Sequence, residues 1–428
     1  MVSNHNFKEQ SFLVYGLGLT GRSVINFFKK NNVKKYMVWD DLNKKLFKNK
    51  RPNNLKKAFK DVNHIVLSPG ISLNNSKNKD LLIQHKSKII TDIDIIFLLN
   101  KSFKSIVVTG TNGKSTTCKI IYHILKRNNF KVLLGGNIGT PILNLNIKKD
   151  NFLIIEASSF QLSYSKFIRP DYAILLNITN DHLDWHKNMK DYKNSKFKIF
   201  ENQKKNQFSF LNKKFKGSFK KKKYLGKLII PKIIDYQKIK PKIINPYLKL
   251  NINDENMCNA FFLSKLLKIS ENNFLNSLKS FIGLPHRYEI FLKRKNCIFI
   301  NDSKATSFQA TKFALQNSTN IFWIVGGLPK QKDQIILKNL KKNIIRSYII
   351  GKNINFFENQ LKNQVKYFVT RDLKTSIIRI LKDIKLLKKR TNTILFSPAS
   401  ASFDQFLNFE KRGEEFKKIT KYYARKYI

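Results

Sequence analysis

The segment at 109–116, TGTNGKST, carries residue types at a spacing that could hold a polyphosphate. An apolar β-branched run precedes it and a helical pattern follows it. Gly110 and Gly113 would let the backbone curl so that its N–H groups point at phosphate oxygens. Lys114 would add a positive charge, and Ser115 would offer a hydroxyl to Mg²⁺. Although the loop is two residues shorter than the general GxxxxGK[ST] pattern, the sequence predicts a nucleoside triphosphate site here.

A carboxylate stands at the end of the next predicted strand, 152–156. Glu156 closes that strand and is followed by ASSFQL. A carboxylate at the carboxyl end of a strand beside a phosphate loop is well placed to hold Mg²⁺. The alternative is an ordinary surface Glu. The metal-binding interpretation gains weight because the chain has only 28 acidic residues against 82 basic ones.

The loop at 180–186, NDHLDWH, combines two histidines with two aspartates. His182 and His186 are four residues apart, and Asp181 and Asp184 stand beside them. The grouping of two of the seven histidines in one strand-end loop favours a functional role over a purely structural one. Zinc stays open as an interpretation, but no third ligand is evident.

Lys196 shares one face of a predicted helix with Tyr192 and Phe200, at positions i, i+4 and i+8. Burial of an ammonium group is unfavourable and lowers its pKa, so this lysine would be chemically distinct if the face is buried. In a chain so rich in lysine, the pattern alone does not single it out.

A second glycine turn, GLGLTG, occupies 16–21, and Asp40 closes the following strand. This is the dinucleotide fingerprint, and by itself it is compatible with NAD and a dehydrogenase. Its physical content is narrower, because a glycine turn at a helix N-terminus accepts any pyrophosphate. A nucleoside linked to a diphosphate would serve equally well.

Alternation of short apolar strands with amphipathic helices predicts an α/β fold with mostly parallel sheets. A length of 428 residues corresponds to about three domains of ~100–200 residues. We expect a Rossmann-like domain at 1–100, a central phosphate-loop domain at 101–285 and a Rossmann-like α/β domain at 286–428. Short strands and loops are expected at 203–250 and a buried helix at 257–267. The main strands are expected at 12–15, 37–40, 64–70, 105–108, 152–156, 172–177, 297–302, 321–327, 347–351, 365–369 and 393–398.

The three cysteines, Cys118, Cys258 and Cys297, are too far apart in sequence for a disulfide framework or a metal cluster, and we expect inert buried thiols in a reducing compartment. The N-terminal residues show no apolar signal core, and no apolar run reaches the ~18 residues of a membrane span. We therefore expect a soluble cytoplasmic protein.

The formal net charge of +54 is high enough to suggest nucleic-acid binding. Lys, Asn, Ile and Phe are abundant together, however, and the lysines are spread along the chain. That pattern is typical of A/T-rich codon usage, which we favour over a dedicated nucleic-acid surface. A basic nucleic-acid-binding ATPase stays as the competing hypothesis.

In order along the chain, the motifs resemble those of the Mur ligases of peptidoglycan synthesis. The likeness covers essentially the whole chain, and GLGLTG together with the last motif points to the member that adds D-glutamate rather than to a sibling ligase. The motifs are GLGLTG at 16, SPGI at 68, TGTNGKST at 109, GGNIGTP at 135, EASSFQL at 156, DHLD at 181, NMCNA at 256, GLPHRYE at 283, NDSKAT at 301 and SPASASFDQFLNFEKRG at 397.

The resemblance implies an ATP-dependent ligase that joins D-glutamate to UDP-N-acetylmuramoyl-L-alanine through an acyl phosphate. It implies two Mg²⁺ sites and a carbamate, derived from CO₂, on Lys196. It also implies a monomer that acts on small molecules, with no specific nucleic-acid partner and no membrane insertion.

The resemblance also assigns residues. The implied catalytic residues are Lys114, His182 and Lys196, and the implied metal ligands are Ser115, Glu156, His182 and the Lys196 carbamate. The implied ATP site comprises Gly110, Thr111, Asn112, Gly113, Lys114, Ser115, Thr116, Asn256, Asn259, Arg287 and Asp302. The implied UDP-substrate site comprises Gly18, Leu19, Thr20, Asp40, Ser68, Asn137, Ser158, Gln161 and His182. The implied D-glutamate pocket comprises Thr306, Lys330, Ser402 and Phe409, with Lys304 nearby.

The chain departs from the family pattern at a few positions. Glu255 stands where the family usually has His, beside the residues implied to face adenine. Asp41 and Leu42 stand where a polar residue and an Arg often assist UDP binding, and Ala157 replaces a usual Leu. None of these positions belongs to the implied metal or phosphate ligands.

Overall fold

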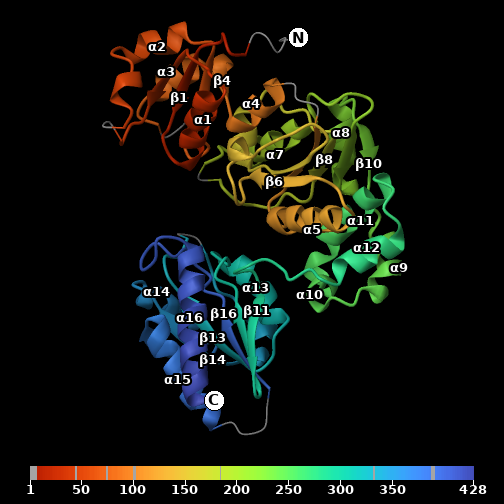
Figure 1. Ribbon diagram of the computed structural model, residues 1–428. Coiled ribbons are helices and arrows are strands. Elements are labelled where there is room, and N and C mark those ends of the chain that lie inside the picture. The colour runs from red at the N-terminus through yellow and green to blue at the C-terminus, as the bar shows by residue number, and fades with distance from the viewer. Residues whose placement is uncertain are drawn as a thin grey trace. The chain divides into compact units, whose positions relative to one another are not determined.

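The computed structural model describes residues 7–43, 46–73, 76–99, 103–183, 185–330, 333–386 and 391–428. The chain divides into two compact units, Met1–Phe281 and Ile282–Ile428. In the described ranges the strands form three sheets, two in the first unit and one in the second (Figure 1). The predicted α/β class is confirmed. None of the helices in these ranges is long and apolar enough to cross a membrane.

The first sheet has the strand order β2-β1-β3-β4, and all its pairs are parallel. The three predicted strands are present as short apolar runs in the sheet interior, but the third ends at Leu67 rather than at residue 70, and β4 was not predicted. The strands are β1 Phe12–Tyr15, β2 Tyr36–Trp39, β3 His64–Leu67 and β4 Ile89–Ile90, and the helices are α1 Leu19–Lys30, α2 Leu55–Asp61, α3 Lys79–Gln84 and α4 Asp92–Leu98.

The second sheet has the order β10-β9-β8-β5-β7-β6, again parallel. The phosphate-loop strand β5 therefore lies between the strands that carry the two other candidate loops. The strands are β5 Lys104–Thr109, β6 Val132–Gly136, β7 Phe152–Glu156, β8 Tyr172–Leu175, β9 Phe208–Leu211 and β10 Lys227–Ile229. The helices include α5 Lys114–Arg127, α6 Ser159–Tyr164 and α7 Met189–Phe197.

The segment at 203–250 places its two strands, β9 and β10, at the edge of this sheet, as predicted. It also contains three short helices that alternation of Ile and Lys did not reveal. These are α8 Lys216–Lys221, α9 Ile233–Ile239 and α10 Pro246–Lys249. The predicted buried helix is α11 Asp254–Leu266, which packs with α12 Glu271–Leu278 against α5 (Figure 1).

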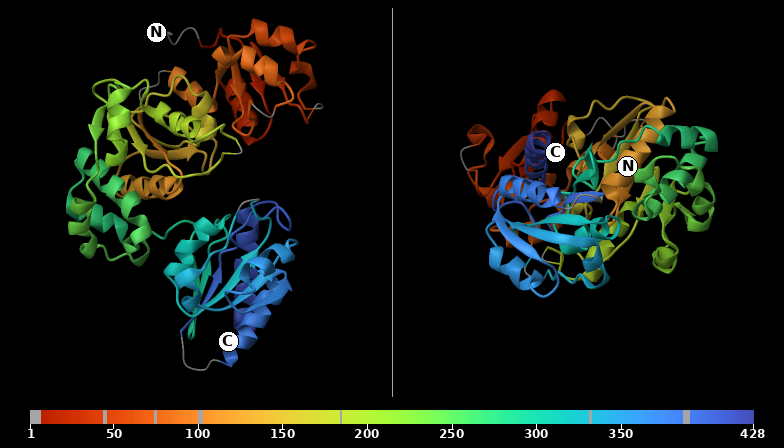
Figure 2. Two further views of the ribbon diagram at one scale, coloured as in Figure 1. Left: turned by 180° about the vertical axis from the view of Figure 1, so that it is seen from behind. Right: turned by 90° about the horizontal axis from the view of Figure 1, so that it is seen from below.

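The second unit contains a six-stranded sheet with the order β11-β12-β16-β13-β14-β15. Its edge strand β11, Glu289–Arg294, is antiparallel to β12 and was not predicted, because a two-residue turn at Lys295 and Asn296 hides the break. The helices α15 and α16 lie side by side (Figure 2). The remaining elements are β12 Cys297–Asn301, α13 Phe308–Gln316, β13 Ile321–Gly326, β14 Ile344–Ile350, α14 Ile354–Leu361, β15 Tyr367–Arg371, α15 Leu373–Lys385, β16 Asn392–Phe396 and α16 Phe409–Tyr427.

Candidate functional site

The predicted strand–loop–helix arrangement is present between β5 and α5. Gly113 caps the helix with φ +82°, a conformation that favours glycine. A Cβ at this position would lie 2.3 Å from Oδ1 of Asn256 on α11. That oxygen accepts a hydrogen bond from the Thr117 hydroxyl at 3.0 Å, so moving it away would break this bond. Asn256, predicted to face adenine, thus lies directly beneath the loop, with 5% of its surface exposed.

Lys114 is the first residue of α5 and lies folded over the loop. Its ammonium group donates to the carbonyl oxygens of Gly110 at 2.9 Å and Thr111 at 2.8 Å. Ser115 follows in the first helical turn and is 5% exposed. The lysine and the serine hydroxyl predicted from the motif therefore both lie at the N-terminus of α5.

Lys196 on α7 is buried, with 1% of its surface exposed. Its Nζ donates at 2.7 Å to the same Gly110 carbonyl that Lys114 contacts, and it lies 4.5 Å from the centroid of the Tyr192 ring. Burial, followed by the charge of Lys114, holds the pKa of Lys196 well below its usual value. The predicted helix is shorter than expected, because α7 ends at Phe197 and Phe200 lies in the 3-10 turn Lys198–Phe200 that follows; Tyr192 and Phe200 are both fully buried. The sheet order thus brings together two lysines that are far apart in sequence.

Glu156 ends β7 and is 2% exposed. Its Oε1 accepts a hydrogen bond from the side-chain amide of Asn137 at 3.1 Å, and its backbone carbonyl accepts from the Asn137 N–H at 2.8 Å. Its other carboxylate oxygen, Oε2, is buried and has no hydrogen-bond partner. A buried carboxylate oxygen without a donor is costly unless a cation meets it. The residues present therefore fit a Mg²⁺ ion next to Glu156.

His182 adopts a left-handed backbone conformation, φ +55°, in the loop after β8. Its backbone N–H donates to Asp181 at 2.9 Å, and its Nε2 lies 3.5 Å from the other oxygen of that carboxylate. The ring packs against Phe160 at a centroid distance of 4.8 Å. The imidazole is 40% exposed, so it is accessible to a substrate or a metal.

His186 differs from His182, although the sequence grouped them. It is 4% exposed, its Nε2 lies 3.0 Å from the Ser159 hydroxyl, and its ring stacks on Phe160. Asp184 lies outside the described residues. In the described part of the chain no three His, Cys, Asp or Glu side chains cluster as metal ligands, so zinc gains no support.

The N-terminal glycine turn is stabilised by the chain's own polar groups. A Cβ on Gly21 would lie 1.9 Å from the Gly16 carbonyl oxygen, which also accepts the Ser68 hydroxyl at 2.8 Å. Gly18 caps α1, and Leu19 begins it with 83% of its surface exposed. Thr20 follows in the first turn of that helix.

Asp40 organises the same turn. Its carboxylate accepts backbone N–H groups from Leu17 at 2.7 Å, Asn43 at 2.8 Å and Leu42 at 2.9 Å. Burial by itself would raise the pKa of Asp40, but these donors outweigh it and hold the pKa below its usual value. Both carboxylate oxygens accept backbone N–H groups, so Asp40 stabilises the conformation of the turn.

Ser158 and Gln161 begin α6 as a capping box, in which each side chain bonds the other residue's backbone N–H. The Gln161 amide also donates to Asp92 of α4 at 3.3 Å. Asp92 is fully buried, and burial, partly opposed by this hydrogen bond, raises its pKa to about 6. Sequence reasoning missed Asp92. The available signal was an acidic residue inside the apolar run TDIDII.

In the second unit, the residues implied for D-glutamate follow strands that are neighbours in the sheet. Thr306 follows β12, Lys330 follows β13 and Ser402 follows β16, and the sheet order places β16 between the other two. Leu328 and Ala401 exchange backbone hydrogen bonds of 2.9 Å, which joins two of these loops.

Phe409 begins α16, and the ammonium of Lys304 lies 3.7 Å from the centroid of its ring. The buried Arg412, which sequence reasoning did not assign, donates to the carbonyl oxygens of Ser303 at 2.8 Å and Ser400 at 2.9 Å. The motif NFEKRG contained it, but no local pattern indicated which carbonyls it would reach.

Asp302, implied to meet ATP together with Arg287, follows β12 and is buried. It accepts hydrogen bonds from the Ser397 hydroxyl at 2.6 Å and the Tyr288 N–H at 3.0 Å. Burial raises its pKa to about 7, although both hydrogen bonds and the charge of Arg287 act in the opposite direction. A carboxyl with this pKa would change charge near neutral pH.

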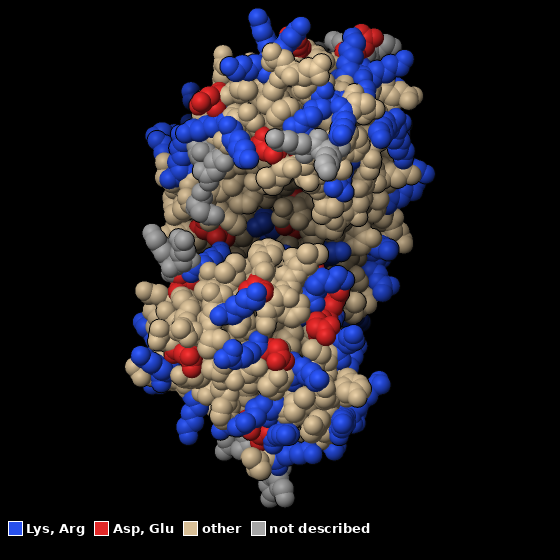
Figure 3. All heavy atoms as spheres, turned by 90° about the vertical axis from the view of Figure 1, so that its left-hand side faces the viewer, with Lys and Arg blue, Asp and Glu red and all other residues tan. Residues whose placement is uncertain are grey.

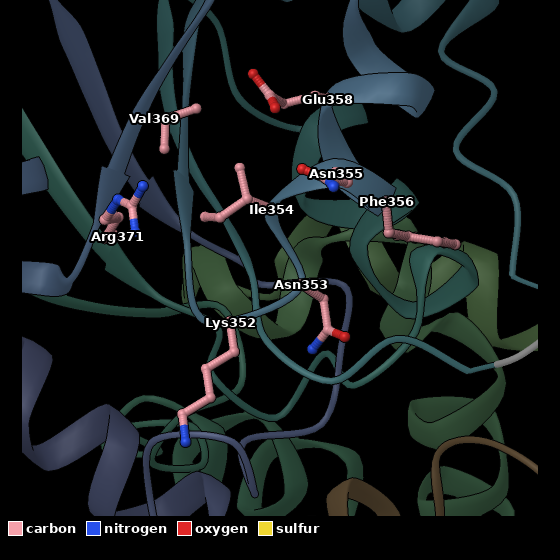
Figure 4. A pocket seen from close by; sticks show the side chains of 8 residues that line it. All are labelled: Lys352, Asn353, Ile354, Asn355, Phe356, Glu358, Val369 and Arg371. Atoms are coloured by element: carbon pink, nitrogen blue, oxygen red, sulfur yellow. The ribbon is translucent and has the colours of Figure 1, made fainter.

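A cavity of about 690 Å³ lies in the second unit beside α14 and the ends of β14 and β15 (Figure 4). Sequence reasoning assigned none of its lining residues. They are Lys352, Asn353, Ile354, Asn355, Phe356, Glu358, Val369 and Arg371.

Basic side chains are scattered over both units on the face drawn in Figure 3, interspersed with other residues. They do not gather into one strip on that face. This distribution is the one expected when composition, rather than a binding surface, sets the charge.

The parallel sheets and the glycine–lysine loop define a phosphate-loop α/β protein. Residues 108–266 match the family model of the Mur ligase middle domain. Two relatives named UDP-N-acetylmuramoylalanine--D-glutamate ligase are each 34% identical to this chain. The protein from Rickettsia prowazekii (strain Madrid E) aligns over 97% of this chain and 98% of its own length. The protein from Buchnera aphidicola subsp. Schizaphis graminum (strain Sg) aligns over 98% and 99%. This chain belongs to the Mur ligase family.

Solved structures agree at the level of the fold. The crystal structure of MurF ligase from Thermotoga maritima in complex with ADP superposes with a TM-score of 0.58 at 16% identity, covering 100% of this chain and 97% of that one. UDP-N-acetylmuramate-alanine ligase MurC from the same organism gives 0.55 at 17% identity, covering 97% and 100%.

Proposed function

We propose that this chain is an ATP-dependent ligase that joins D-glutamate to UDP-N-acetylmuramoyl-L-alanine in peptidoglycan precursor synthesis. Relatives of that name support the proposal, since they align with nearly the whole chain. The structural observation that carries it is the convergence of Lys114 and Lys196 on the Gly110 carbonyl. Glu156 supports it further, because its buried Oε2 has no partner. The ADP complex of the MurF neighbour supports ATP as the nucleotide.

The chemistry requires a carboxylate to attack a phosphoryl group, and both are anionic. Two unit charges about 4 Å apart repel by about 4 kcal/mol at an effective dielectric constant near 20. In our proposal the ammonium of Lys114 leaves the carbonyls of Gly110 and Thr111 and meets the terminal phosphate. There it stabilises the charge that develops during transfer.

Bound Mg²⁺ would screen the phosphates at two sites. We propose Ser115, Glu156, His182 and the carbamate of Lys196 as ligands. As an unmodified ammonium, Lys196 would repel a cation, whereas a carbamate is an anion. Burial lowers the pKa of Lys196, and this shift favours the neutral amine that addition of CO₂ requires.

Phosphoryl transfer gives an acyl phosphate on the alanyl carboxyl group. The amine of D-glutamate then attacks the acyl carbon, and phosphate leaves as the amide forms. The amine loses its proton as the amide forms. We keep His182, whose backbone N–H donates to Asp181, as a metal ligand only, because an imidazole whose lone pair binds Mg²⁺ cannot also take that proton.

We propose that the substrates bind to the residues that the family resemblance assigned. We propose that the turn at 16–21 with Asp40 and Ser68 holds the UDP group, and that Asn137, Ser158 and Gln161 meet the sugar-peptide. Adenine would meet Asn259, and the loops after β12, β13 and β16 would hold D-glutamate.

We also propose three domains, 1–100, 101–285 and 286–428, each with its own sheet. The chain would act as a cytoplasmic monomer on small molecules, without a specific nucleic-acid partner. Support for a reducing compartment comes from the three cysteines, which are free and buried.

One assay tests the proposal. Purified protein is incubated with Mg·ATP and UDP-N-acetylmuramoyl-L-alanine, and ADP release is measured across a panel of D- and L-amino acids. We expect ADP release that depends on D-glutamate and on the UDP substrate. Preference for another amino acid would indicate a sibling ligase, and release stimulated only by nucleic acid would indicate the competing ATPase. A product formed without ADP would refute ATP-driven ligation.

A further inference from the structure

The carboxylate of Glu255 connects two elements of the first unit that are far apart in sequence. Glu255 lies in the first turn of α11 and is half-buried. Its Oε2 accepts a hydrogen bond from the side-chain amide of Asn177 at 2.5 Å. Asn177 follows β8, 78 residues earlier in the chain. The contact therefore joins α11 to the strand end beside the phosphate loop.

Asn177 in turn holds the outermost part of the loop. Its side-chain Oδ1 accepts the backbone N–H of Asn112 at 2.9 Å, and its Nδ2 lies 3.3 Å from the Asn112 carbonyl oxygen as a donor. Its backbone carbonyl accepts the Thr111 N–H at 2.8 Å. Asn112 itself is exposed, so these contacts substitute for packing at the loop tip.

The Glu255 carboxylate acts together with the backbone of Asn112 to orient the Asn177 amide. An amide side chain has a donor end and an acceptor end, and either end could face a neighbour that both donates and accepts. An ionised carboxylate only accepts hydrogen bonds. Glu255 therefore requires the NH₂ end on its side and leaves Oδ1 for the Asn112 N–H. A flipped amide would place two acceptors together at Glu255.

We propose that Glu255 is a positioning residue for the phosphate loop, acting through the side-chain amide of Asn177 to hold Asn112 in the conformation that receives the triphosphate. The proposal rests on nucleotide binding by this loop, as in the proposed function. A carboxylate near the phosphates would otherwise weaken binding by charge repulsion. Its hydrogen bond to Asn177 gives a physical reason for its presence.

The first test is direct binding of the non-hydrolysable analogue Mg·AMP-PNP to the full chain, measured by calorimetry. Glu255→Ala should bind about tenfold more weakly or worse, the scale expected for loss of a hydrogen bond to a charged group. Glu255→Gln should recover most of this loss, because its amide oxygen can accept the same hydrogen bond. Glu271→Ala is the matched control, since it removes a first-turn carboxylate from α12 that pairs with Lys242 on the surface. It should leave the affinity unchanged.

A double-mutant cycle with Asn177→Ala separates this chain of contacts from general destabilisation. If Glu255 acts through Asn177, the double variant should bind within about twofold of the weaker single variant. Hydrogen exchange of the Asn112 amide should also accelerate in Glu255→Ala and stay slow in Glu271→Ala. Additive losses, or unchanged binding in a folded Glu255→Ala protein, would overturn the proposal.

Turnover tells this inference apart from the proposed function. Weaker binding of Mg·AMP-PNP by Glu255→Ala, in a protein that shows no D-glutamate-dependent ADP release, would support the positioning role and refute the ligase. Normal ligation together with unchanged binding of Mg·AMP-PNP in Glu255→Ala would refute the positioning role and support the ligase. In the ligase, we expect KM for ATP to rise while KM for D-glutamate stays constant.

Discussion

The two glycine turns of the first unit occupy the same place between a strand and a helix but differ in chemistry. Each follows a parallel strand and begins a helix, at 16–21 before α1 and at 110–113 before α5. In the first turn, the polar groups of Asp40 and Ser68 are bonded to the turn's own backbone. Around the second turn, two lysines share one carbonyl and a carboxylate oxygen has no partner.

The difference in hydrogen bonding suits the first turn to binding a substrate and the second turn to catalysing a reaction. A turn whose polar groups are already bonded can receive a ligand without rearrangement, which suits recognition of a constant diphosphate group. A turn with concentrated charge and an unpartnered acceptor is completed only by an ionic ligand. This arrangement suits a site where charge moves during the reaction. Substitutions in the two turns should therefore affect different kinetic constants.

The largest effect is expected for Lys196→Ala. The loss of the buried amine removes both the hydrogen bond to Gly110 and the proposed carbamate, so turnover should fall to the assay background. Added short carboxylates such as acetate should restore part of it. Full activity of this variant without added carboxylate would disprove the carbamate.

Lys114→Ala should come next, with a loss of at least ~3 kcal/mol of transition-state stabilisation, typical of one electrostatic contact in a dry site. The loss should appear in kcat/KM for ATP, measured by steady-state ADP release. Melting temperature serves as the control for folding. Near-normal kinetics would remove Lys114 from the mechanism.

Gly21→Ala should destabilise the first turn by about 1–3 kcal/mol, because its Cβ would lie 1.9 Å from the Gly16 carbonyl oxygen. KM for the UDP substrate should rise while binding of Mg·AMP-PNP is unaffected. Gly18→Ala is the matched control for stability alone, measured as melting temperature, since a Cβ there has nothing within 4 Å in the protein. Equal effects of the two changes on melting temperature would contradict the close-approach argument.

The smallest effect is expected for Asp40→Asn, seen in the pH dependence of stability. The pKa of Asp40 is lowered in the folded protein, so its charge stabilises the fold above the unfolded-state value of about 3.9. That contribution is lost as pH falls through the folded-state pKa. The difference in melting temperature between the wild-type protein and the variant should therefore be constant near neutrality and narrow below about pH 4. If the difference in melting temperature stayed constant below about pH 4, the lowered pKa of Asp40 would be refuted.

Local patterns predicted much of the fold. The strands around the phosphate loop were predicted because buried parallel strands are short apolar runs, as in Ile106, Val107 and Val108, which are fully buried. The antiparallel edge strand β11 was missed because a tight turn joins it to β12. The three short helices of the segment at 203–250 were missed because Ile and Lys alternate there in a way that also fits strands.

The sequence alone determined the glycine–lysine turn, its strand and its helix, because these depend on residues within one short segment. It also indicated Lys196 and Glu156 as residues of interest, but not that Lys196 reaches the carbonyl of Gly110, 86 residues away. The pairing of β8 with β5 decided that contact, and the packing of α11 against α5 decided the bond from Asn177 to Glu255. Strand order depends on packing across the whole sheet, and no local run of residues encodes it.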